Sequence, residues 1–196
     1  LRRKGSGPVM SYLKAEDAYT DWFMRPTATL QDALYKEMIG HVQETDTSVP
    51  YRFGDYFYYH RTEAGKQYAI YCRKHGSLDA PEEIVLDLNE LGKGKPFIEL
   101  GVYEVSDDGH LLAYSLDFTG FREYTLYVKD LRAGKLLPDK VDKVDNAVWA
   151  ADNQTIFYTA EDEAKRPYGM YRHRLGAKEQ TLVFDEKDER FSIDVS

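Results

Sequence analysis

The sequence predicts a mainly β protein, in which about three four-stranded blades of a partial β-propeller follow an N-terminal two-helix arm. Three observations predict this class. Apolar residues recur at helical spacing only within about the first 48 residues. From Tyr51 onward, short alternating or aromatic runs are separated by turn residues. One strand-turn-strand pattern then occurs three times, and a repeat every roughly 40–50 residues is typical of propeller blades.

The first helix of the arm is expected over about 8–24. Pro8 suits the first turn of a helix whose cap is Ser6 or Gly7, and Pro26 ends the helix. The apolar side chains along this segment recur mainly every three or four positions, at Val9, Tyr12, Leu13, Tyr19, Trp22 and Phe23. This spacing places them on one face of a helix.

A second helix is expected over about 30–43. Thr29 with Asp32 resembles a capping box, with aspartate in place of the usual Glu or Gln. The apolar stripe of this helix is Leu30, Ala33, Leu34, Met38 and Val42. We therefore assign residues 1–48 to a helical arm and residues 49–196 to the β part.

The repeated pattern begins with a turn step at Gly54, Asp108 and Asp152. Each copy has two anchor tyrosines 13 residues apart, which are Tyr58 and Tyr71, Tyr114 and Tyr127, and Tyr158 and Tyr171. A third strand is expected after each copy (EEIVLDL, GKLL, QTLVFD), and a fourth precedes the next turn (FIELGVYEVS, VDNAVWA). The DLNELGKGKP stretch is interpreted as a loop insertion, and FSIDVS as the opening strand of another blade.

Both faces of the middle copy are apolar. Leu112, Tyr114 and Leu116 share one face of a strand, and Leu111 and Ala113 share the other. A sheet that is apolar on both faces needs a neighbour on each side, so several blades must stack. We therefore expect an exposed blade edge in this chain and self-association through it. The alternative is a generic meander whose tyrosines coincide by chance.

Composition excludes several classes of partner. The net charge of −8 argues against nucleic acid and anionic membrane surfaces, which demand a basic footprint. No apolar run is long enough to span a bilayer, and the start, LRRKGSGP, is not a signal peptide.

The single cysteine, Cys72, excludes an internal disulfide and fits a cytoplasmic location. Because no Met begins the chain, we expect it to be cut from a longer one.

No catalytic, cofactor-binding or metal-binding residue is assigned within the chain. The G-x-S-x-G elbow, H-E-x-x-H, paired C-x-x-C and G-x-x-x-x-G-K motifs are all absent. Cys72 is interpreted as a small half-buried side chain, and the acidic runs at 107–108 and 184–189 as turns and solvated surface. The five histidines (His41, His60, His75, His110, His173) have no ligand spacing.

Several long ordered strings in the chain resemble a known family. They are SYLKAEDAYTDWFM, ETDTSVPYRFGDYFYY, RTEAGKQYAIYCRK, APEEIVLDLNEL, VSDDGHLLAYSLDFTGFREYTLYVKDL, VWAADNQTIFYT and YRHRLG. Together they resemble the amino-terminal region of the prolyl oligopeptidase family of serine peptidases, and within it the oligopeptidase B (protease II) group. The resemblance covers essentially the whole chain.

The resemblance implies a seven-bladed propeller joined to an α/β-hydrolase domain that carries a Ser-Asp-His triad and an oxyanion site. Residues 1–48 would be an arm that packs on the hydrolase domain, and residues 49–196 roughly the first three blades. The propeller would restrict entry to short peptides, which the oligopeptidase B group cleaves after Lys and Arg. The triad, the oxyanion site and the basic-residue pocket would all lie outside this chain, so it is expected to be inactive alone and to need no cofactor.

Two other classes remain open. One is a propeller scaffold that binds proteins, although the Trp-Asp dipeptide of WD repeats is absent and the scaffold leaves the arm unexplained. The other is a propeller that binds a small ligand or sugar, although Trp22 and Trp149 are the only tryptophans.

Overall fold

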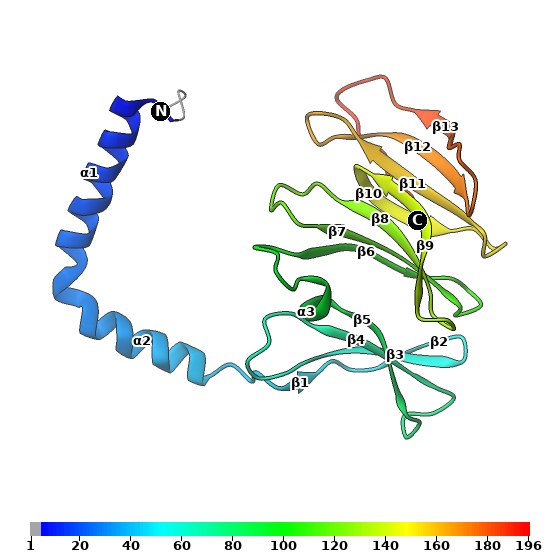
Figure 1. The fold of residues 1–196 in the computed structure, drawn as a ribbon, viewed down its shortest axis with the longest axis horizontal. Helices are drawn as coiled ribbons and strands as arrows, with labels where there is room; N and C mark the ends of the chain where they lie inside the picture. The colour runs from blue at the N-terminus through cyan, green and yellow to red at the C-terminus, as the bar shows by residue number, and fades with distance from the viewer. Residues whose placement is uncertain (1–4) are drawn as a thin grey trace. The chain divides into compact units, whose positions relative to one another are not determined.

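The computed structural model describes residues 5–196. It divides the chain into two compact units, one ending at Glu44 and the other spanning Thr45–Ser196. The first unit is helical, and the second consists of β-sheets with one short helix, α3 (Figure 1).

The first unit contains the two helices of the predicted arm. Helix α1 spans Gly7–Met24, with Ser6 as its N-cap and Pro8 in its first turn, and helix α2 spans Ala28–Gly40. A short 3-10 turn, Arg25–Thr27, joins them at Pro26. None of the side chains described in these helices is buried.

The predicted capping box at Thr29 is wrong. Helix α2 begins two residues earlier than predicted, at Ala28, and Thr27 is its N-cap. The Thr27 hydroxyl donates to the Met24 carbonyl at 2.7 Å and accepts from the Gln31 side chain at 2.7 Å, so it ties the two helices together at their junction. The helix also ends before the predicted residue 43, at Gly40.

The second unit contains three antiparallel sheets that follow one another along the chain (Figure 1). The first has the order β1-β3-β4-β5, with β2 paired to the same edge of β3, and the others have the orders β6-β7-β8-β9 and β10-β11-β12-β13. The strands of the first sheet are β1 (Asp46–Thr47), β2 (Tyr51–Phe53), β3 (Tyr56–Thr62), β4 (Ile70–His75) and β5 (Glu82–Asp87), followed by α3 (Leu88–Leu91). The second sheet contains β6 (Glu99–Val105), β7 (Leu111–Asp117), β8 (Thr125–Asp130) and β9 (Lys135–Asp142). The third contains β10 (Val144–Trp149), β11 (Thr155–Glu161), β12 (Pro167–Arg174) and β13 (Thr181–Asp185). The prediction of about three blades of a partial propeller is confirmed.

Two copies of the repeated pattern occupy matching places in successive sheets. Tyr114 of β7 lies directly opposite Tyr127 of β8, and their ring centroids are 5.7 Å apart. Tyr158 of β11 lies opposite Tyr171 of β12 in the same way, with centroids 5.5 Å apart. In these two copies the 13-residue spacing marks a cross-strand pair.

The first copy does not follow this register. Tyr58 of β3 pairs with Arg73, and Tyr71 pairs with His60. Tyr58 and Tyr71 face the second sheet, whereas Tyr114 faces back toward the first. The equivalence of Tyr58 with Tyr114 is therefore wrong, although the strand pairs that carry them correspond.

The core lies between the sheets, as the two apolar faces of the middle copy predict. One cluster packs between the first and second sheets, and includes Tyr58, Val85, Leu86, Leu112, Tyr114 and Leu116. A second packs between the second and third sheets, and includes Val102, Ala113, Leu126, Val128, Ile156 and Tyr158. Strand β7 supplies both clusters through alternate residues, since neighbouring side chains of a strand point to opposite faces.

Side chains also donate hydrogen bonds to backbone carbonyls of the neighbouring sheet. Arg73 donates to Gly109 at 2.6 Å and Lys129 to Val85 at 2.7 Å, so each links the first two sheets. Trp149 donates to Glu104 at 2.9 Å and links the second and third sheets.

Strands β6 and β10, the first strands of the second and third sheets, approach each other. The first strands of the sheets therefore converge, as they do at the inner ends of propeller blades. We call β1, β2, β6 and β10 the innermost strands.

The end of the chain lies beside the innermost strand β10. The side-chain amide of Asn146 in β10 donates to the Asp194 carboxylate at 2.7 Å and to the Val195 carbonyl at 2.9 Å. Residues 191–196, which the sequence predicts to open another blade, form no strand here.

Candidate functional site

The five histidines, which are scattered along the sequence, lie in separate elements. His41 follows α2, His60 lies in β3, His75 ends β4, His110 lies in the turn before β7, and His173 lies in β12. Across residues 5–196, no group of three or more His, Cys, Asp or Glu side chains is placed to hold a metal ion.

His173 is the histidine with a buried acidic partner. Its Nε2 lies 2.8 Å from a carboxylate oxygen of Asp139, and the side chains are 7% and 5% exposed. The same oxygen accepts the Gly176 N–H at 2.7 Å. This pair joins β12 of the third sheet to β9 of the second, and we interpret it as a structural link between sheets.

The 107–108 run forms a turn, as predicted, whereas the 184–189 run begins within β13, which ends at Asp185. In the 107–108 run, Asp108 accepts from the Ser106 hydroxyl at 2.6 Å and from the His110 N–H at 3.0 Å. In the 184–189 run, Asp188 forms an ion pair with Arg190 at 2.6 Å.

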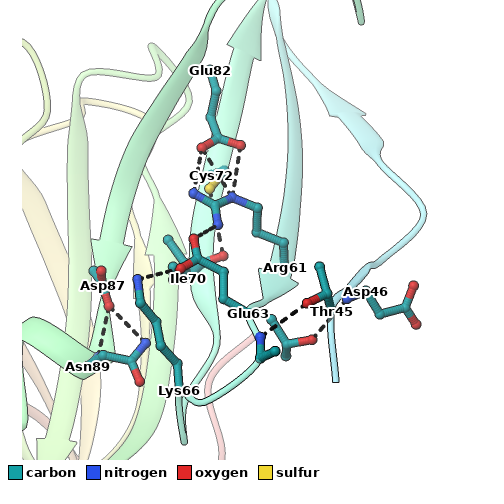
Figure 2. A network of polar contacts seen from close by, with 12 residues as sticks. Thr45, Asp46, Arg61, Glu63, Lys66, Ile70, Cys72, Glu82, Asp87 and Asn89 are labelled. Carbon is teal, nitrogen blue, oxygen red and sulfur yellow. Dashed lines mark hydrogen bonds and ion pairs between the residues drawn. The ribbon is translucent and has the colours of Figure 1, made fainter. Parts of the chain in front are cut away.

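Cys72 lies under a polar network on the face of the first sheet that is turned away from the second (Figure 2). Cys72 packs with Tyr59 and Ile70 in a small cluster of its own, separate from the core between the sheets. The Arg61 guanidinium binds Glu82, with Nη2 at 2.9 Å and Nε at 3.2 and 3.1 Å. We call Tyr59, Arg61, Ile70, Cys72 and Glu82 the free face of the first sheet.

The network extends beyond this pair. Arg61 also binds Glu63, and Lys66 reaches the other oxygen of Glu63 at 2.7 Å. Glu82 accepts in addition from the Tyr59 hydroxyl at 2.6 Å. Every charge in this group therefore has an opposite charge or a hydrogen-bond donor beside it.

The electrostatics of the free face favour a structural role over a catalytic one. Burial raises the pKa of Cys72 to about 11, helped by the nearby Glu82 carboxylate, so the thiol is protonated at neutral pH and is a weak nucleophile. Hydrogen bonding to Arg61 lowers the pKa of Glu82, which is therefore a paired carboxylate and a poor general base.

A cavity of about 230 Å³ lies at the innermost strands of the first two sheets. Five tyrosines and a histidine form most of its wall, namely Tyr51, Tyr58, Tyr59, Tyr71, Tyr103 and His60. The rings contact one another across strands and sheets: Tyr71 and Tyr103 stack with centroids 4.9 Å apart, and Tyr51 and Tyr58 with centroids 5.8 Å apart. We call this cavity the tyrosine pocket.

The tyrosine pocket is not apparent from the sequence. The abundance of tyrosine indicated strands, but Tyr103 is 32 residues from Tyr71 along the chain and meets it only because the first two sheets pack together. One local signal was present: Pro50, which cannot donate to a ladder, lies in the interruption between β1 and β2 that the pocket occupies.

The chain resembles known proteins over its whole length. The family model described as "Prolyl oligopeptidase, N-terminal beta-propeller domain" matches residues 1–196. "Protease 2" from Moraxella lacunata is 37% identical over 206 residues, which cover 100% of this chain and 30% of that protein. "Dipeptidyl aminopeptidase BI" from Pseudoxanthomonas mexicana is 38% identical over 206 residues, which cover 95% of this chain and 28% of that protein. The chain thus spans less than a third of the length of these relatives.

A solved structure matches the fold as well. The structure of oligopeptidase B from Leishmania major superposes with a TM-score of 0.85 at 31% sequence identity. The superposition covers 96% of this chain and 27% of that one. The superposed residues therefore include residues of the helical arm as well as residues of the sheets.

No helix within residues 5–196 is long and apolar enough to cross a membrane.

Proposed function

The chain belongs to the prolyl oligopeptidase family, as its N-terminal β-propeller domain, and from this premise we propose that it gates a serine peptidase that hydrolyses short peptides. The observation that carries the proposal is the family match over all 196 residues, together with relatives named as peptidases. Chemistry would be supplied by a C-terminal α/β-hydrolase domain of the same parent chain. The sheets would supply selection, because a closed propeller excludes folded proteins from the site by size.

In such an enzyme a serine activated by a histidine attacks the peptide carbonyl, and N–H donors stabilise the oxyanion. The groups of this chain that could be considered for such chemistry are already paired or buried. Cys72 lies beneath the Arg61–Glu82 pair, and His173 is buried against Asp139. We therefore propose that residues 1–196 alone are inactive.

The helical arm would dock on the hydrolase domain. Its large apolar side chains support this, since Tyr19, Trp22 and Phe23 are each about 60% exposed in the arm itself. Apolar helix faces of this kind normally pack against another surface.

Cleavage after Lys or Arg is part of the proposal, and so is a cytoplasmic location, for which the single cysteine is the only support. A second mode of cleavage is favoured by one observation. The relative named dipeptidyl aminopeptidase BI is as similar to this chain as the one named Protease 2. Release of dipeptides from a free amino terminus is therefore the second candidate activity.

A fluorophosphonate probe tests the proposal, because it labels activated serines. The full-length protein should be labelled, and residues 1–196 should not. Failure of the full-length protein to react would overturn the peptidase assignment and favour a non-catalytic scaffold; labelling of residues 1–196 would overturn the assignment of chemistry to the hydrolase domain.

Fluorogenic peptides separate the two modes of cleavage. One substrate has a blocked amino terminus and Arg before the reporter, and an endopeptidase should hydrolyse it. The other is a dipeptide with a free amino terminus joined to the reporter. An enzyme that releases dipeptides should hydrolyse only this second substrate. Replacement of Arg by citrulline, which is neutral and of nearly the same shape, should abolish most of the hydrolysis if the charge is recognised.

A further inference from the structure

Arg73 shows how one sheet of this protein binds the next. It lies opposite Tyr58 in the first sheet, and Tyr58 packs into the core against the second sheet. The Arg73 side chain is 4% exposed, and its Nη1 donates to the Gly109 carbonyl at 2.6 Å. Gly109 lies in the turn between β6 and β7, the first two strands of the second sheet. A side chain of one sheet thus binds the backbone of the first turn of the next sheet.

Arg172 has the same register position in the third sheet. It lies opposite Phe157, and the two residues are 15 apart in the sequence, which is also the separation of the pair in the first sheet. Ile156 and Tyr158, on either side of Phe157, belong to the core between the second and third sheets. Neighbouring side chains of a strand point to opposite faces, and directly opposite residues share a face. Phe157 and Arg172 therefore lie on the face that is turned away from the second sheet.

The second sheet shows that this arginine is not a general feature of the repeat. The residues at its equivalent positions are Ala113 and Val128, which lie opposite each other and are also 15 apart. Both are buried in the core against the third sheet. An apolar pair is therefore sufficient at one boundary between sheets, whereas the first and third sheets each present an aromatic ring and a guanidinium.

The Arg172 guanidinium has no hydrogen-bond or ion-pair partner within residues 5–196, and the residue is exposed. Its neighbour on the same face, Arg174, donates to the Gln154 side chain at 2.8 Å. A cavity of about 270 Å³ lies beside the two arginines, and its wall is formed by Thr155, Arg172, Arg174, Ala177, Glu179 and Thr181. The cavity leaves space next to Arg172 for an acceptor from another segment.

The two arginines differ in the acceptors that their own sheets supply. Glu83 lies opposite Arg73 in β5 and binds it at 2.8 Å, whereas Thr181 lies opposite Arg172 in β13. A guanidinium carries five N–H donors, and its burial is costly unless acceptors satisfy them. A segment that covers the third sheet must therefore bring acceptors to Arg172.

We propose that Arg172 links the third sheet to the sheet that follows it in the parent chain, by donating to a backbone carbonyl in the turn between the first two strands of that sheet. The presence of a following sheet rests on the proposed function. The role of Arg172 rests on its register match with Arg73 and on its free guanidinium beside a cavity.

Hydrogen exchange of the full-length protein, measured by mass spectrometry, tests this link. Arg172→Met should make exchange about tenfold faster in the first turn of the following sheet, because that turn loses a hydrogen bond from a charged donor. Arg172→Lys, which keeps one donor group, should restore part of the protection. Unchanged exchange beyond residue 196 in Arg172→Met would overturn the proposal, and so would a change confined to residues 155–181 or to the hydrolase domain.

Two further variants calibrate the measurement. Arg73→Met should accelerate exchange at residues 106–110, which contain the turn that Arg73 binds, and should leave the segment beyond residue 196 unchanged. Arg132→Met, at a side chain that is 62% exposed in the second sheet, should change neither region. Equal effects of Arg172→Met and Arg132→Met beyond residue 196 would contradict a specific link.

Chemical modification gives a readout that needs no variant to fold. Phenylglyoxal reacts with accessible guanidinium groups, and peptide mapping reports the rate at each arginine. In the full-length protein Arg172 should react as slowly as the buried Arg73, and Arg132 should react much faster. Equal rates at Arg172 and Arg132 would overturn the proposal.

Neither readout depends on hydrolysis. A full-length protein that protects Arg172 but fails to react with the fluorophosphonate probe would keep the link between sheets and lose the peptidase assignment. A protein that reacts with the probe but leaves Arg172 unprotected would keep the peptidase assignment and lose the link.

Discussion

Leu112 lies at the centre of β7 with 0% of its surface exposed, in the cluster that also contains Tyr58 and Val85 of the first sheet. Leu112→Ala should reduce the free energy of unfolding by about 2–5 kcal/mol, because it removes buried methyl groups and leaves a cavity that two sheets cannot close. Urea denaturation followed by circular dichroism measures the change. Leu136→Ala is the control: its side chain is 56% exposed, and the loss should stay below about 0.5 kcal/mol. Equal losses in the two variants would contradict a core between the sheets.

Glu82 provides a pH-dependent contribution to stability. Its pKa in the folded protein is lowered from the ordinary value of 4.5, first by hydrogen bonding to Arg61. A carboxyl group with a lowered folded pKa stabilises the fold fully above its unfolded pKa, and this contribution is lost as the pH falls through the folded value. The wild type should therefore exceed Glu82→Gln in unfolding free energy at pH 7, and the difference should shrink as the pH falls below about 4.5.

Denaturation curves of both proteins between pH 7 and pH 3 check this expectation. Glu90→Gln is a suitable control, because Glu90 pairs with Lys93 while its side chain is 60% exposed. An exposed pair contributes little, so the control should follow the wild type closely. If the difference in unfolding free energy between wild type and Glu82→Gln does not change with pH, the charge of Glu82 is not what stabilises the free face.

The three tyrosine pairs show how far residue-level reasoning from the sequence reaches. The 13-residue spacing correctly located the strand pairs in all three copies, and in the second and third it located true cross-strand partners. In the first copy Tyr58 pairs with Arg73, because a different hairpin sets the register. A shift in register changes which face a side chain occupies, and linear spacing does not record it.

At the scale of the element, the innermost strands share an irregularity that the sequence does not announce. Strand β6 has a bulge between Leu100 and Tyr103, and β10 has one between Val144 and Ala147. In each bulge a hydroxyl of the neighbouring strand fills the gap in the ladder. The Ser115 hydroxyl accepts the Val102 N–H at 2.8 Å, and the Thr159 hydroxyl accepts the Asn146 N–H at 3.2 Å. Bulges of this kind increase local twist and satisfy backbone groups that would otherwise be unpaired.

Ser115→Ala should destabilise the second sheet by about 1–3 kcal/mol, because it leaves the buried Val102 N–H without an acceptor. Thermal or urea unfolding measures the loss, and hydrogen exchange of the Val102 amide should become faster in the variant. The control is Ser77→Ala, at an exposed serine whose hydroxyl accepts the Asp79 N–H at 3.1 Å, and its cost should stay below about 0.5 kcal/mol. Unchanged exchange at Val102 would show that the hydroxyl does not close this bulge.

Most elements were predictable and their irregular features were not. Alternation and turn residues predicted the strands of the second and third sheets, and helical spacing predicted both helices of the arm. The cap of α2 was misplaced by two residues, because Thr27 is fixed by a bond back to Met24 in the preceding turn. The split of the first innermost strand into β1 and β2 depends on the bonds between Ser48 and His60, which join residues 12 positions apart. Local pattern carries no information about such pairings.

At the scale of the whole molecule, the functional features arise where sheets meet. Tyr71 and Tyr103 form one wall of a pocket although each belongs to a different sheet. The sequence predicted that neighbouring blades would cover both faces of the middle copy, since those faces are apolar. It did not predict which side chains would converge at the inner edge, because the twist and stacking of complete sheets determine that convergence.

The ends of the stack of sheets remain uncovered in this chain, and this leads to an expectation about its behaviour in solution. Within residues 5–196, strand β13 is an edge strand whose one partner is β12, and its apolar side chains Leu182, Val183 and Phe184 are each about half exposed. An exposed apolar edge strand is a template for pairing with another chain. Under the proposed function the following blade covers the face of the third sheet that is turned away from the second, including the side chains that β13 presents there, whereas residues 1–196 alone leave that face and the β13 edge exposed.

Residues 1–196 should therefore self-associate, with a weight-average mass in light scattering that rises above the monomer value as concentration increases. Val183→Lys should shift this rise to higher concentration, because a lysine on an edge strand opposes pairing by charge and solvation. The matched control is Phe121→Lys, which removes an even more exposed apolar side chain, 74% exposed, from a hairpin tip outside any strand. If both lysine variants reduce association equally, general surface hydrophobicity and not the β13 edge is responsible. A monomeric wild type at high concentration would mean that the uncovered sheets need no neighbour, and the stacking argument for an incomplete propeller would lose its physical basis.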